Sequence, residues 1–460
     1  MNPHAYYESR ITELSIRLAQ LKRLSFLLSM SRLFVFLMMC LGCYTFFPSV
    51  QIISGIIIVG LAAFLFLVAR YSDAKAKRKF HQTLVNINAA ELLALKGDLS
   101  SYKTGTEYVT EEHYYNQDID LFGAGSIFQS INRTGTKNGE KYLAHWLNSN
   151  SIDAVEKKQA AIQELTEKAE LRQHFQATGE IIEKEVELNA IVTWAKTYIS
   201  KIPKLFKWVP LVFSILSILV IAGFFFGFIP GKGLGVWFFI GLGITGKFLK
   251  SITKLANDGG RVQEIFGQYA KLISMIENQE LKADLLKKLQ SYLKVSGVAV
   301  STILAQLSKE FASLDQRNNV FFGIIANGFF LWDLRYASRV ERWLETHEVS
   351  LDDWFKVVSQ FDAYNSMANF NFNHPNYVMP EVSHTKELAI EADALGHPLL
   401  LASKRVDNDL KMNTEDFLII TGANMAGKST FLRTVALNIV MANCGLPVCA
   451  KSFKYTPIKL

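Results

Sequence analysis

The sequence has few cysteines, and one long stretch of it has no charge. Only four cysteines occur among 460 residues, and none has the histidine or second cysteine pair that a zinc site requires, so we interpret them as structural residues. Residues 33–69 contain no charged residue. This stretch is too long for the apolar part of a signal peptide, and no small-residue cleavage site stands out. Half of the residues are hydrophobic and the mean hydropathy is positive. This composition indicates a membrane protein with a cytosolic part.

The uncharged stretch predicts a pair of membrane-spanning helices. A single helix over its 37 residues would be about 55 Å long, whereas the hydrocarbon core of a bilayer is about 30 Å thick. The chain must therefore fold back, and Pro48-Ser49 is the expected turn because proline breaks a helix. We expect the first span to begin near Phe26, with the Arg32 side chain at the headgroups.

A second pair of apolar segments follows at residues 209–246. Val209–Ile229 is long enough to span a bilayer, Pro230–Gly233 predicts a turn, and Leu234–Gly246 predicts a returning helix. The returning segment is short and rich in glycine, so a re-entrant or interfacial helix is an alternative. The sequence thus predicts two transmembrane hairpins.

Basic residues orient both hairpins. They flank each pair of spans, whereas the two turns between spans carry only Lys232. By the positive-inside rule everything except these turns lies in the cytosol, which predicts a multi-pass protein of the inner or plasma membrane with most of its chain cytoplasmic. The flanks account for much of the net charge of +7, which is therefore weak evidence for a nucleic acid partner.

Outside the hairpins the pattern is mostly helical. A helix capped by Ser151 is expected to continue to Phe175. Apolar residues recur at helical spacing in Arg261–Lys294 and Gly297–His347, and we interpret the aromatic residues of the second range as core and interhelix contacts. At Asn373 the pattern changes to prolines and short alternating stretches, which predicts the start of an α/β domain.

A phosphate-binding loop stands in this last part of the chain. Residues 422–429, GANMAGKS, fit the pattern G-x-x-x-x-G-K-[ST] without a gap. The glycines let backbone N–H groups surround phosphate oxygens, and the N-terminus of the predicted helix Ser429–Cys444 adds positive potential. Lys428 is expected to contact the β- and γ-phosphates, and the Ser429 hydroxyl to bind Mg²⁺. Phe417–Ile420 predicts a short buried strand before the loop, and together with the motif and the helix this context predicts a nucleotide-binding site with Mg²⁺.

The loop and the residues after it, TGANMAGKSTFLRTVALNIVMANCGLPVCA, resemble the MutS family of ATPases, whose loop is close to TGPNMxGKST. This chain has Ala423 and Ala426 where the family commonly has proline and glycine. Residues 120–147, which contain an N-[RK]-T-x-T-x-x-G turn, resemble the start of the MutS core domain. Leu395–Leu400, LGHPLL, is similar to the R-H-P stretch near the adenine.

The resemblance implies a set of nucleotide-binding residues and a mechanism. The implied residues are Gly422, Asn424, Met425, Ala426, Gly427, Lys428, Ser429, Thr430, His397 and Pro398, with Ser429 also the metal ligand. In the family two ATPase domains enclose ATP between them, which implies a homodimer through this domain and movement of lever helices with the nucleotide state. No catalytic residue is identified in this chain.

Parts of the MutS pattern do not occur in the sequence. No phenylalanine is followed two residues later by glutamate, the pair with which the family probes mismatched DNA, and the second hairpin stands where the family inserts a DNA clamp. After the loop helix only one further candidate strand remains, Pro447–Lys451, and no apolar run ends in a pair of acids. We therefore expect the ATPase domain to be truncated.

These observations lead to one prediction with two alternatives. We predict a mainly α protein with a helical core and lever region, two transmembrane hairpins and an incomplete α/β P-loop NTPase domain. The expected parts are residues 1–80 (N-terminal helix and first hairpin), 81–200 (core), 201–255 (second hairpin), 256–372 (lever helices) and 373–460 (start of the ATPase domain). The leading function is a membrane-anchored MutS-like ATP-binding protein. The alternatives are a mismatch-repair ATPase that binds DNA, and a membrane scaffold that binds nucleotide without hydrolysing it.

Overall fold

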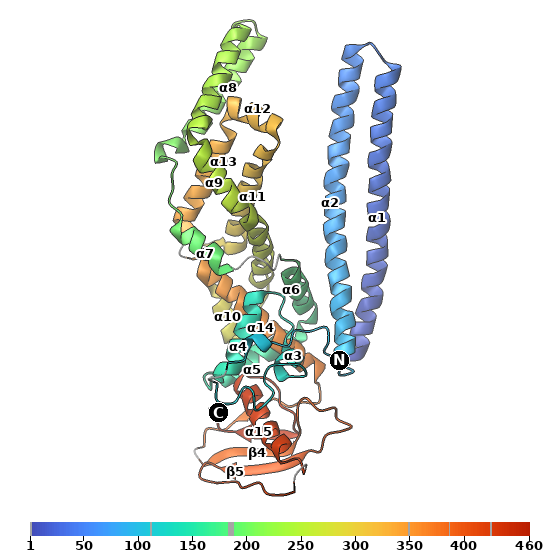
Figure 1. Cartoon of the computed structure of the whole chain (residues 1–460), viewed down its shortest axis with the longest axis vertical. Coiled ribbons are helices and arrows are strands. Elements are labelled where there is room, and N and C mark those ends of the chain that lie inside the picture. Colours follow the sequence, from blue (N-terminus) through green and yellow to red (C-terminus); the bar gives the residue numbers. More distant parts are fainter. Residues whose placement is uncertain (1, 111–112, 183–187, 348–349, 386, 424–425) are drawn as a thin grey trace. The chain divides into compact units, whose positions relative to one another are not determined.

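The structure is a computed structural model that describes residues 2–110, 113–182, 188–347, 350–385, 387–423 and 426–460 (Figure 1). Helices predominate, which confirms that the protein is mainly α. The chain divides into two compact units. The first consists of Met1–Arg133, Ala144–Ile181 and Asn365–Leu460, and the second of Thr134–Leu143 and Ile182–Tyr364.

The first unit begins with two long helices, α1 (Pro3–Thr45) and α2 (Val50–Ala94), which pack side by side (Figure 1). The Asn2 side chain caps α1 by accepting a hydrogen bond from His4 N at 3.0 Å. The chain turns at residues 46–49, which confirms the turn predicted at Pro48-Ser49. The remaining helices of this unit are η1 (Thr106–Tyr108), α3 (Ile127–Ile131), the second half of α4 (Lys137–Ser149), α5 (Val155–Glu167), α6 (Ala169–Ile181), the end of α14 (Leu351–Asn373) and α15 (Lys428–Asn443).

Three helices of the described chain are long and apolar enough to cross a membrane, judged by length and composition. They are Pro3–Thr45, Gln51–Ala94 and the stretch Gly231–Gly260 of α9. Large side chains in the apolar halves of α1 and α2 are exposed, for example Phe34 and Ile58. The other predicted span, α8 (Val209–Phe225), is a shorter apolar helix, as is α12 (Val320–Phe330).

The polar half of α2 packs into the first unit. Leu84 and Ile87 form a small core with Leu14 of α1 and Ala177 of α6. Beside this core the Gln173 amide donates to Asn88 Oδ1 at 2.8 Å, and both side chains are buried. This hydrogen bond pairs two buried polar groups. Left without a partner, either group would destabilise the folded state.

A buried ion pair connects four parts of the first unit. Arg133 Nε lies 2.6 Å from Glu91 Oε1, and both side chains are almost fully buried. On α14, Asn369 and Asn373 each donate to the Glu91 carboxylate at 2.8 Å. Tyr7 of α1 donates to Asn373 Oδ1 at 2.7 Å. The Glu91 carboxylate therefore joins α2, α14 and Arg133, two residues after α3, directly, and α1 through Asn373.

The prediction of one long helix capped by Ser151 is wrong. The chain forms α5 and α6 instead, separated by Lys168 alone, and α5 begins four residues after Ser151. Ser151 Oγ donates to Asp153 Oδ2 at 2.9 Å and accepts from Asp153 N at 3.3 Å. The serine thus closes a local turn, which is the conformation that competes with helix capping for this residue type.

In the second unit the turn at residues 134–139, which carries the Thr-x-Thr-x-x-Gly pattern, is held by one carboxylate. Thr136 N and Thr136 Oγ1 donate to Asp362 Oδ2 at 2.8 and 2.6 Å, and Gly135 N donates to Oδ1 at 3.1 Å. A Cβ on Gly139 would lie 2.3 Å from Asp362 Oδ2, so only glycine fits there. The Thr-x-Thr-x-x-Gly spacing is therefore explained by packing around Asp362 at the start of α4.

The second unit is built on α9 (Gly231–Glu277), which at 47 residues is about 70 Å long. Its other elements are α7 (Leu188–Thr197), η2 (Lys204–Lys207), α8, α10 (Asp284–Ser291), β1 (Lys294–Val295), β2 (Val298–Ala299), α11 (Val300–Asp315), η3 (Gln316–Asn318), α12, α13 (Trp332–His347) and the first part of α14. The predicted boundary at residues 255 and 256 falls inside α9, so the returning segment Leu234–Gly246 is the start of a long helix. Pro230 is the N-cap of this helix, and the turn therefore precedes Gly231 instead of occupying Pro230–Gly233.

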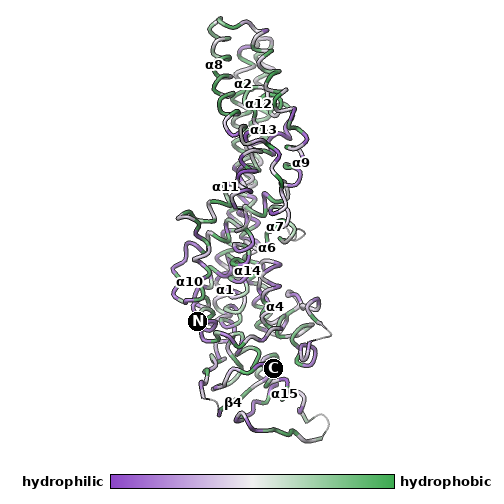
Figure 2. The backbone as a smooth tube through the Cα atoms, turned by 90° about the vertical axis from the view of Figure 1, so that its left-hand side faces the viewer, coloured by the Kyte–Doolittle hydropathy of each residue, from purple (hydrophilic) through white to green (hydrophobic). Residues whose placement is uncertain are grey.

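The prediction that the aromatic residues of Gly297–His347 are mostly core and interhelix contacts is confirmed for Trp343 of α13 and for Phe329 of α12, whose ring lies 5.2 Å from that of Phe238 on α9. Trp343 of α13 is 6% exposed and its indole N–H donates to Ile303 O at 3.1 Å. Phe321 of α12, by contrast, is 83% exposed. Figure 2 shows the hydrophobic residues of α8 and α12 in green. Helical spacing alone does not determine which face of a helix meets the protein.

The C-terminal part of the first unit contains a small mixed sheet with the strand order β3-β6-β4-β5. Its strands are β3 (Glu381–Val382), β4 (Leu388–Leu395), β5 (Asn408–Asn413) and β6 (Ser452–Tyr455). β6 is parallel to β3, and β4 is antiparallel to both β5 and β6. The fully buried Tyr455 of β6 donates to Asn443 Oδ1 at the end of α15, which fixes the helix to the sheet.

Two strand predictions in this region are wrong. Phe417–Ile420 forms no strand, and Phe417 is 87% exposed. Pro447–Lys451 contributes only an isolated bridge from Val448 to Val378, and the strand begins at Ser452. A buried strand requires neighbours that pair with its backbone groups, and residues 417–420 pair with none of the four strands of the sheet.

Candidate nucleotide-binding site

The predicted phosphate loop ends at the first turn of α15. Gly427 is the N-cap of this helix with φ of +85°, a left-handed conformation that glycine adopts without steric cost. Gly427 O accepts the first helical hydrogen bond, from Phe431 N at 2.9 Å. The next backbone N–H groups are free of helical partners by geometry, as in any helix N-terminus, and can bind an anion.

The Lys428 side chain folds back across the loop. Its ammonium group donates to Gly422 O and, at 3.1 Å, to Ala423 O. Ser429 and Thr430 are exposed, so the Ser429 hydroxyl is accessible to a metal ion. The predicted residues Asn424 and Met425 lie outside the described residues.

α15 is tied to the segment that contains His397 and Pro398. The Asn438 amide of α15 donates to Gly396 O at 3.0 Å, and its Oδ1 accepts from Cys449 N at 2.9 Å. Gly396 N in turn donates to Cys449 O at 2.7 Å. This network connects the LGHPLL segment to the helix that follows the phosphate loop. Asn438, its central residue, was not identified from the sequence.

His397 lies beside an ion pair that the sequence did not predict. Arg433 of α15 binds Asp120 with an Nη1–Oδ2 distance of 2.7 Å. Burial lowers the pKa of His397, and although Asp120 opposes this shift, Arg433 adds to it. The ring is therefore neutral near pH 7. Leu399 N donates to His397 Nδ1 at 3.3 Å, which places the proton of the neutral ring on Nε2.

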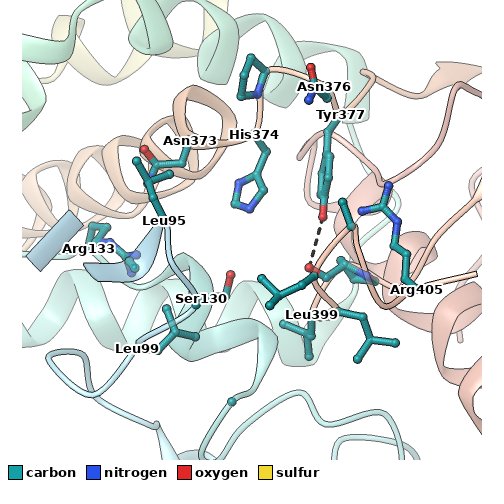
Figure 3. A pocket seen from close by; sticks show the side chains of 18 residues that line it. Leu95, Leu99, Ser130, Arg133, Asn373, His374, Asn376, Tyr377, Leu399 and Arg405 are labelled. Atoms are coloured by element: carbon teal, nitrogen blue, oxygen red, sulfur yellow. Dashed lines mark hydrogen bonds between the residues drawn. The ribbon is translucent and has the colours of Figure 1, made fainter. Parts of the chain in front are cut away.

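A cavity of about 470 Å³ opens next to this segment within the first unit (Figure 3). Pro398 lines it, and the Tyr377 hydroxyl donates to Pro398 O at 3.2 Å. Arg405 and His374 also line the cavity. His374 is buried from bulk solvent, and this burial lowers its pKa to about 4. Among the described lining residues there is none from the phosphate loop. Pro398 therefore lines the cavity, whereas Lys428 lies at the N-terminus of α15. The structure does not bring these two predicted site residues into one pocket.

No group of three or more metal-binding side chains (His, Cys, Asp or Glu) occurs in the part of the chain that the structure describes. Magnesium held by a nucleotide does not require such a group, because it is bound through one or two protein oxygens plus phosphate oxygens. The Ser429 hydroxyl is the protein oxygen that the loop offers. The four cysteines are free, and Cys444 and Cys449 are buried, as expected for structural residues.

Comparison with known proteins assigns the segment that carries this loop. Residues 418–459 match the family described as MutS domain V. A protein named DNA mismatch repair protein MutS from Geobacillus sp. (strain WCH70) is 41% identical over 101 residues, which is 21% of this chain and 11% of that protein. The C-terminal part of this chain is a MutS-family segment.

Two further relatives agree with this assignment of the MutS segment. DNA mismatch repair protein MutS from Staphylococcus haemolyticus (strain JCSC1435) is 35% identical over 128 residues, 26% of this chain and 14% of that protein. DNA mismatch repair protein MutS 1 from Haloarcula marismortui is 35% identical over 124 residues, 26% of this chain and 13% of that protein. The chain therefore spans only about an eighth of the length of these curated relatives.

Proposed function

We propose that this protein is a membrane-anchored, MutS-like protein that binds ATP with Mg²⁺ at the loop of Lys428. The observation that carries the proposal is the phosphate loop itself, which lies in the MutS segment and leads into α15 with Gly427 in the left-handed conformation. Lys428 would hold the β- and γ-phosphates, and Ser429 the metal ion. The residues present fit these roles, because the ammonium group already lies across the loop and the hydroxyl is exposed.

Direct binding tests this part of the proposal. The full chain in detergent micelles is expected to bind a fluorescent ATP analogue saturably when Mg²⁺ is present, and unlabelled ATP should displace the analogue. Binding should weaken when Mg²⁺ is removed with EDTA, because the metal neutralises phosphate charge at the loop. No saturable binding up to millimolar analogue would contradict the assignment of the loop.

The membrane part of the proposal is supported by the three apolar helices and by their basic flanks. We infer that α1 and α2 form one anchor and α8 with the start of α9 a second, in the inner or plasma membrane, with most of the chain cytoplasmic. The nucleotide state would act on the long helices that continue from these anchors, and two copies would associate through the nucleotide-binding domain.

A cysteine-labelling experiment tests the topology. A cysteine replacing Lys232 is expected to react with a membrane-impermeant thiol reagent added outside intact cells, because Lys232 lies at the tip of the second hairpin. A cysteine replacing the exposed Lys294 in the second unit should react only after the membrane is opened. The opposite labelling pattern would overturn the topology, and reaction of both from outside would exclude cytosolic access of the loop to ATP.

Binding of mismatched DNA is a second candidate function, because the relatives that match are named DNA mismatch repair proteins. The chain has no Phe-x-Glu sequence, and its excess positive charge lies largely at the membrane flanks. We therefore expect equal affinity for a mismatched duplex and its matched control at low salt, with both falling as salt is raised. Preference for the mismatched duplex in a competition assay would favour the repair function over our leading proposal.

A further inference from the structure

We propose that α12 (Val320–Phe330) is a third membrane-embedded element of this protein, with its most exposed apolar side chains in the acyl chains of the lipid bilayer. The inference rests on the proposed membrane anchoring and extends it to a helix that the sequence pattern assigned to the lever region. The partner that we propose for the exposed face of α12 is lipid. Four observations on α12 and its neighbours support this inference.

The first observation is that α12 exposes large apolar residues and buries small ones. A helix of a soluble protein does the opposite. Its most exposed side chains are Val320 at 66%, Phe321 at 83%, Ile324 at 47% and Ile325 at 57%. The residues that it buries are Gly323, Ala326, Asn327 and Gly328. A helix of a water-soluble protein buries its largest apolar residues, whereas a membrane helix packs on neighbours through small residues and turns large ones to the lipid.

The second observation is how closely α12 approaches the hairpin. A Cβ on Gly241 of α9 would lie 2.1 Å from Gly328 O, and a Cβ on Gly328 would lie 2.2 Å from the Phe238 ring. Ser214 of α8 donates to Phe330 O at 3.3 Å. α12 is thus fixed against both helices of the second hairpin through small residues, and Figure 1 shows it beside them.

The third observation concerns polar groups. α12 contains no ionisable residue, and its one amide, Asn327, faces the protein and accepts a hydrogen bond from Asp333 N at 2.9 Å. Arg317 Nε lies 3.4 Å from Asp333 Oδ2 on the same side. Asn327, Asp333 and Arg317 line a cavity of about 290 Å³ that also borders α9. Polar residues at membrane depth face the protein interior in this way.

The fourth observation is continuity with the candidate span. The exposed apolar surface of α12 adjoins that of α9, where Phe239 is 70% exposed. Lys247, Lys250 and Lys254 follow on α9 with exposed side chains, at the level where anionic headgroups would meet them. A continuous apolar surface of this kind would be a strong aggregation site in water, so a hydrophobic solvent accounts for it.

The test uses the full chain with Cys40 and Cys43 replaced by alanine, since Cys444 and Cys449 are buried. Single cysteines at Phe321 and Ile325 are labelled with the environment-sensitive fluorophore NBD. The chain is then reconstituted into vesicles of phosphatidylcholine and phosphatidylglycerol. We expect blue-shifted emission that is quenched by nitroxide-labelled lipids and not by aqueous iodide. The matched control is a cysteine at the exposed Arg342 of α13, for which iodide should quench and lipid nitroxides should not.

A further cysteine at Phe239 separates failure of this inference from failure of the anchoring. Lipid quenching at 239 combined with iodide quenching at 321 and 325 would overturn the role of α12 and leave the hairpin in the membrane. Iodide quenching at all three positions would overturn the anchoring itself. Protection of 321 and 325 from both quenchers would also overturn the inference, because it would show that protein, such as a second copy of the chain, covers α12.

Discussion

Replacing Lys428 by alanine is expected to weaken binding of an ATP analogue roughly 10- to 100-fold, since a hydrogen bond to a charged group contributes about 1.5–3 kcal/mol. The side chain places the only ammonium group of the loop 3.1 Å from Ala423 O and beside Gly422 O, so its loss leaves the backbone N–H groups of α15 as the remaining anion site. Fluorescence titration with the full chain in the presence of Mg²⁺ measures the change.

The matched control for this experiment is Lys451→Ala. Lys451 lies in the same MutS segment, and its side chain is exposed. Removing it changes the net charge by the same amount, so a general electrostatic effect would appear in both variants, whereas only Lys428→Ala should lose specific binding. Membrane insertion should be unchanged in both, because insertion depends on the apolar helices. Equal analogue affinity of wild type and Lys428→Ala would exclude the phosphate-binding role.

The second large effect is expected at the buried ion pair of the first unit. Glu91→Gln keeps the shape of the side chain but leaves Arg133 as an unpaired buried charge, and breaking one partner of such a pair destabilises a protein by about 3–5 kcal/mol. The same carboxylate accepts hydrogen bonds from Asn369 and Asn373, so α14 should loosen as well. Urea unfolding of the full chain in mild detergent, followed by tryptophan fluorescence, measures the loss.

Two further variants test whether the loss of stability arises because the Glu91–Arg133 pair is buried. Glu391→Gln removes a carboxylate that lies 2.6 Å from Lys411 Nζ on the exposed face of the sheet, and such a surface pair contributes at most about 1 kcal/mol. The double variant Glu91→Gln with Arg133→Met should be more stable than Glu91→Gln alone, because it removes the stranded charge. Similar midpoints for wild type and Glu91→Gln would contradict the structural role of the pair.

The sequence predicted best the features that depend on neighbouring residues. The loop of Gly427 and Lys428 could be recognised because phosphate binding uses backbone N–H groups, a lysine and a helix start within a few positions. The first pair of apolar helices could be recognised because an uncharged run longer than one membrane span is expected to form two helices. Pro48 marked the turn between them. Both predictions needed no knowledge of distant residues.

Features that join distant residues were not predicted. The Arg433–Asp120 ion pair beside His397 connects positions more than three hundred residues apart, and the acceptor for Arg133 lies on α2. Nothing in the local pattern of Phe417–Ile420 shows whether other strands lie beside it, and the run proved to be exposed and irregular. Likewise the helical period of Val320–Phe330 was visible, but its orientation was not.

By itself, then, the sequence determined where the first apolar hairpin and the phosphate loop lie, because these follow from interactions between residues within a few turns of each other. Tertiary structure decided which faces are buried. It turned the small residues of α12 to the protein and Phe321 outward, and it placed His397 near Arg433 on the helix of Lys428. Burial and long-range pairing depend on what the rest of the chain brings to each surface, and that information is not contained in any local pattern of residues.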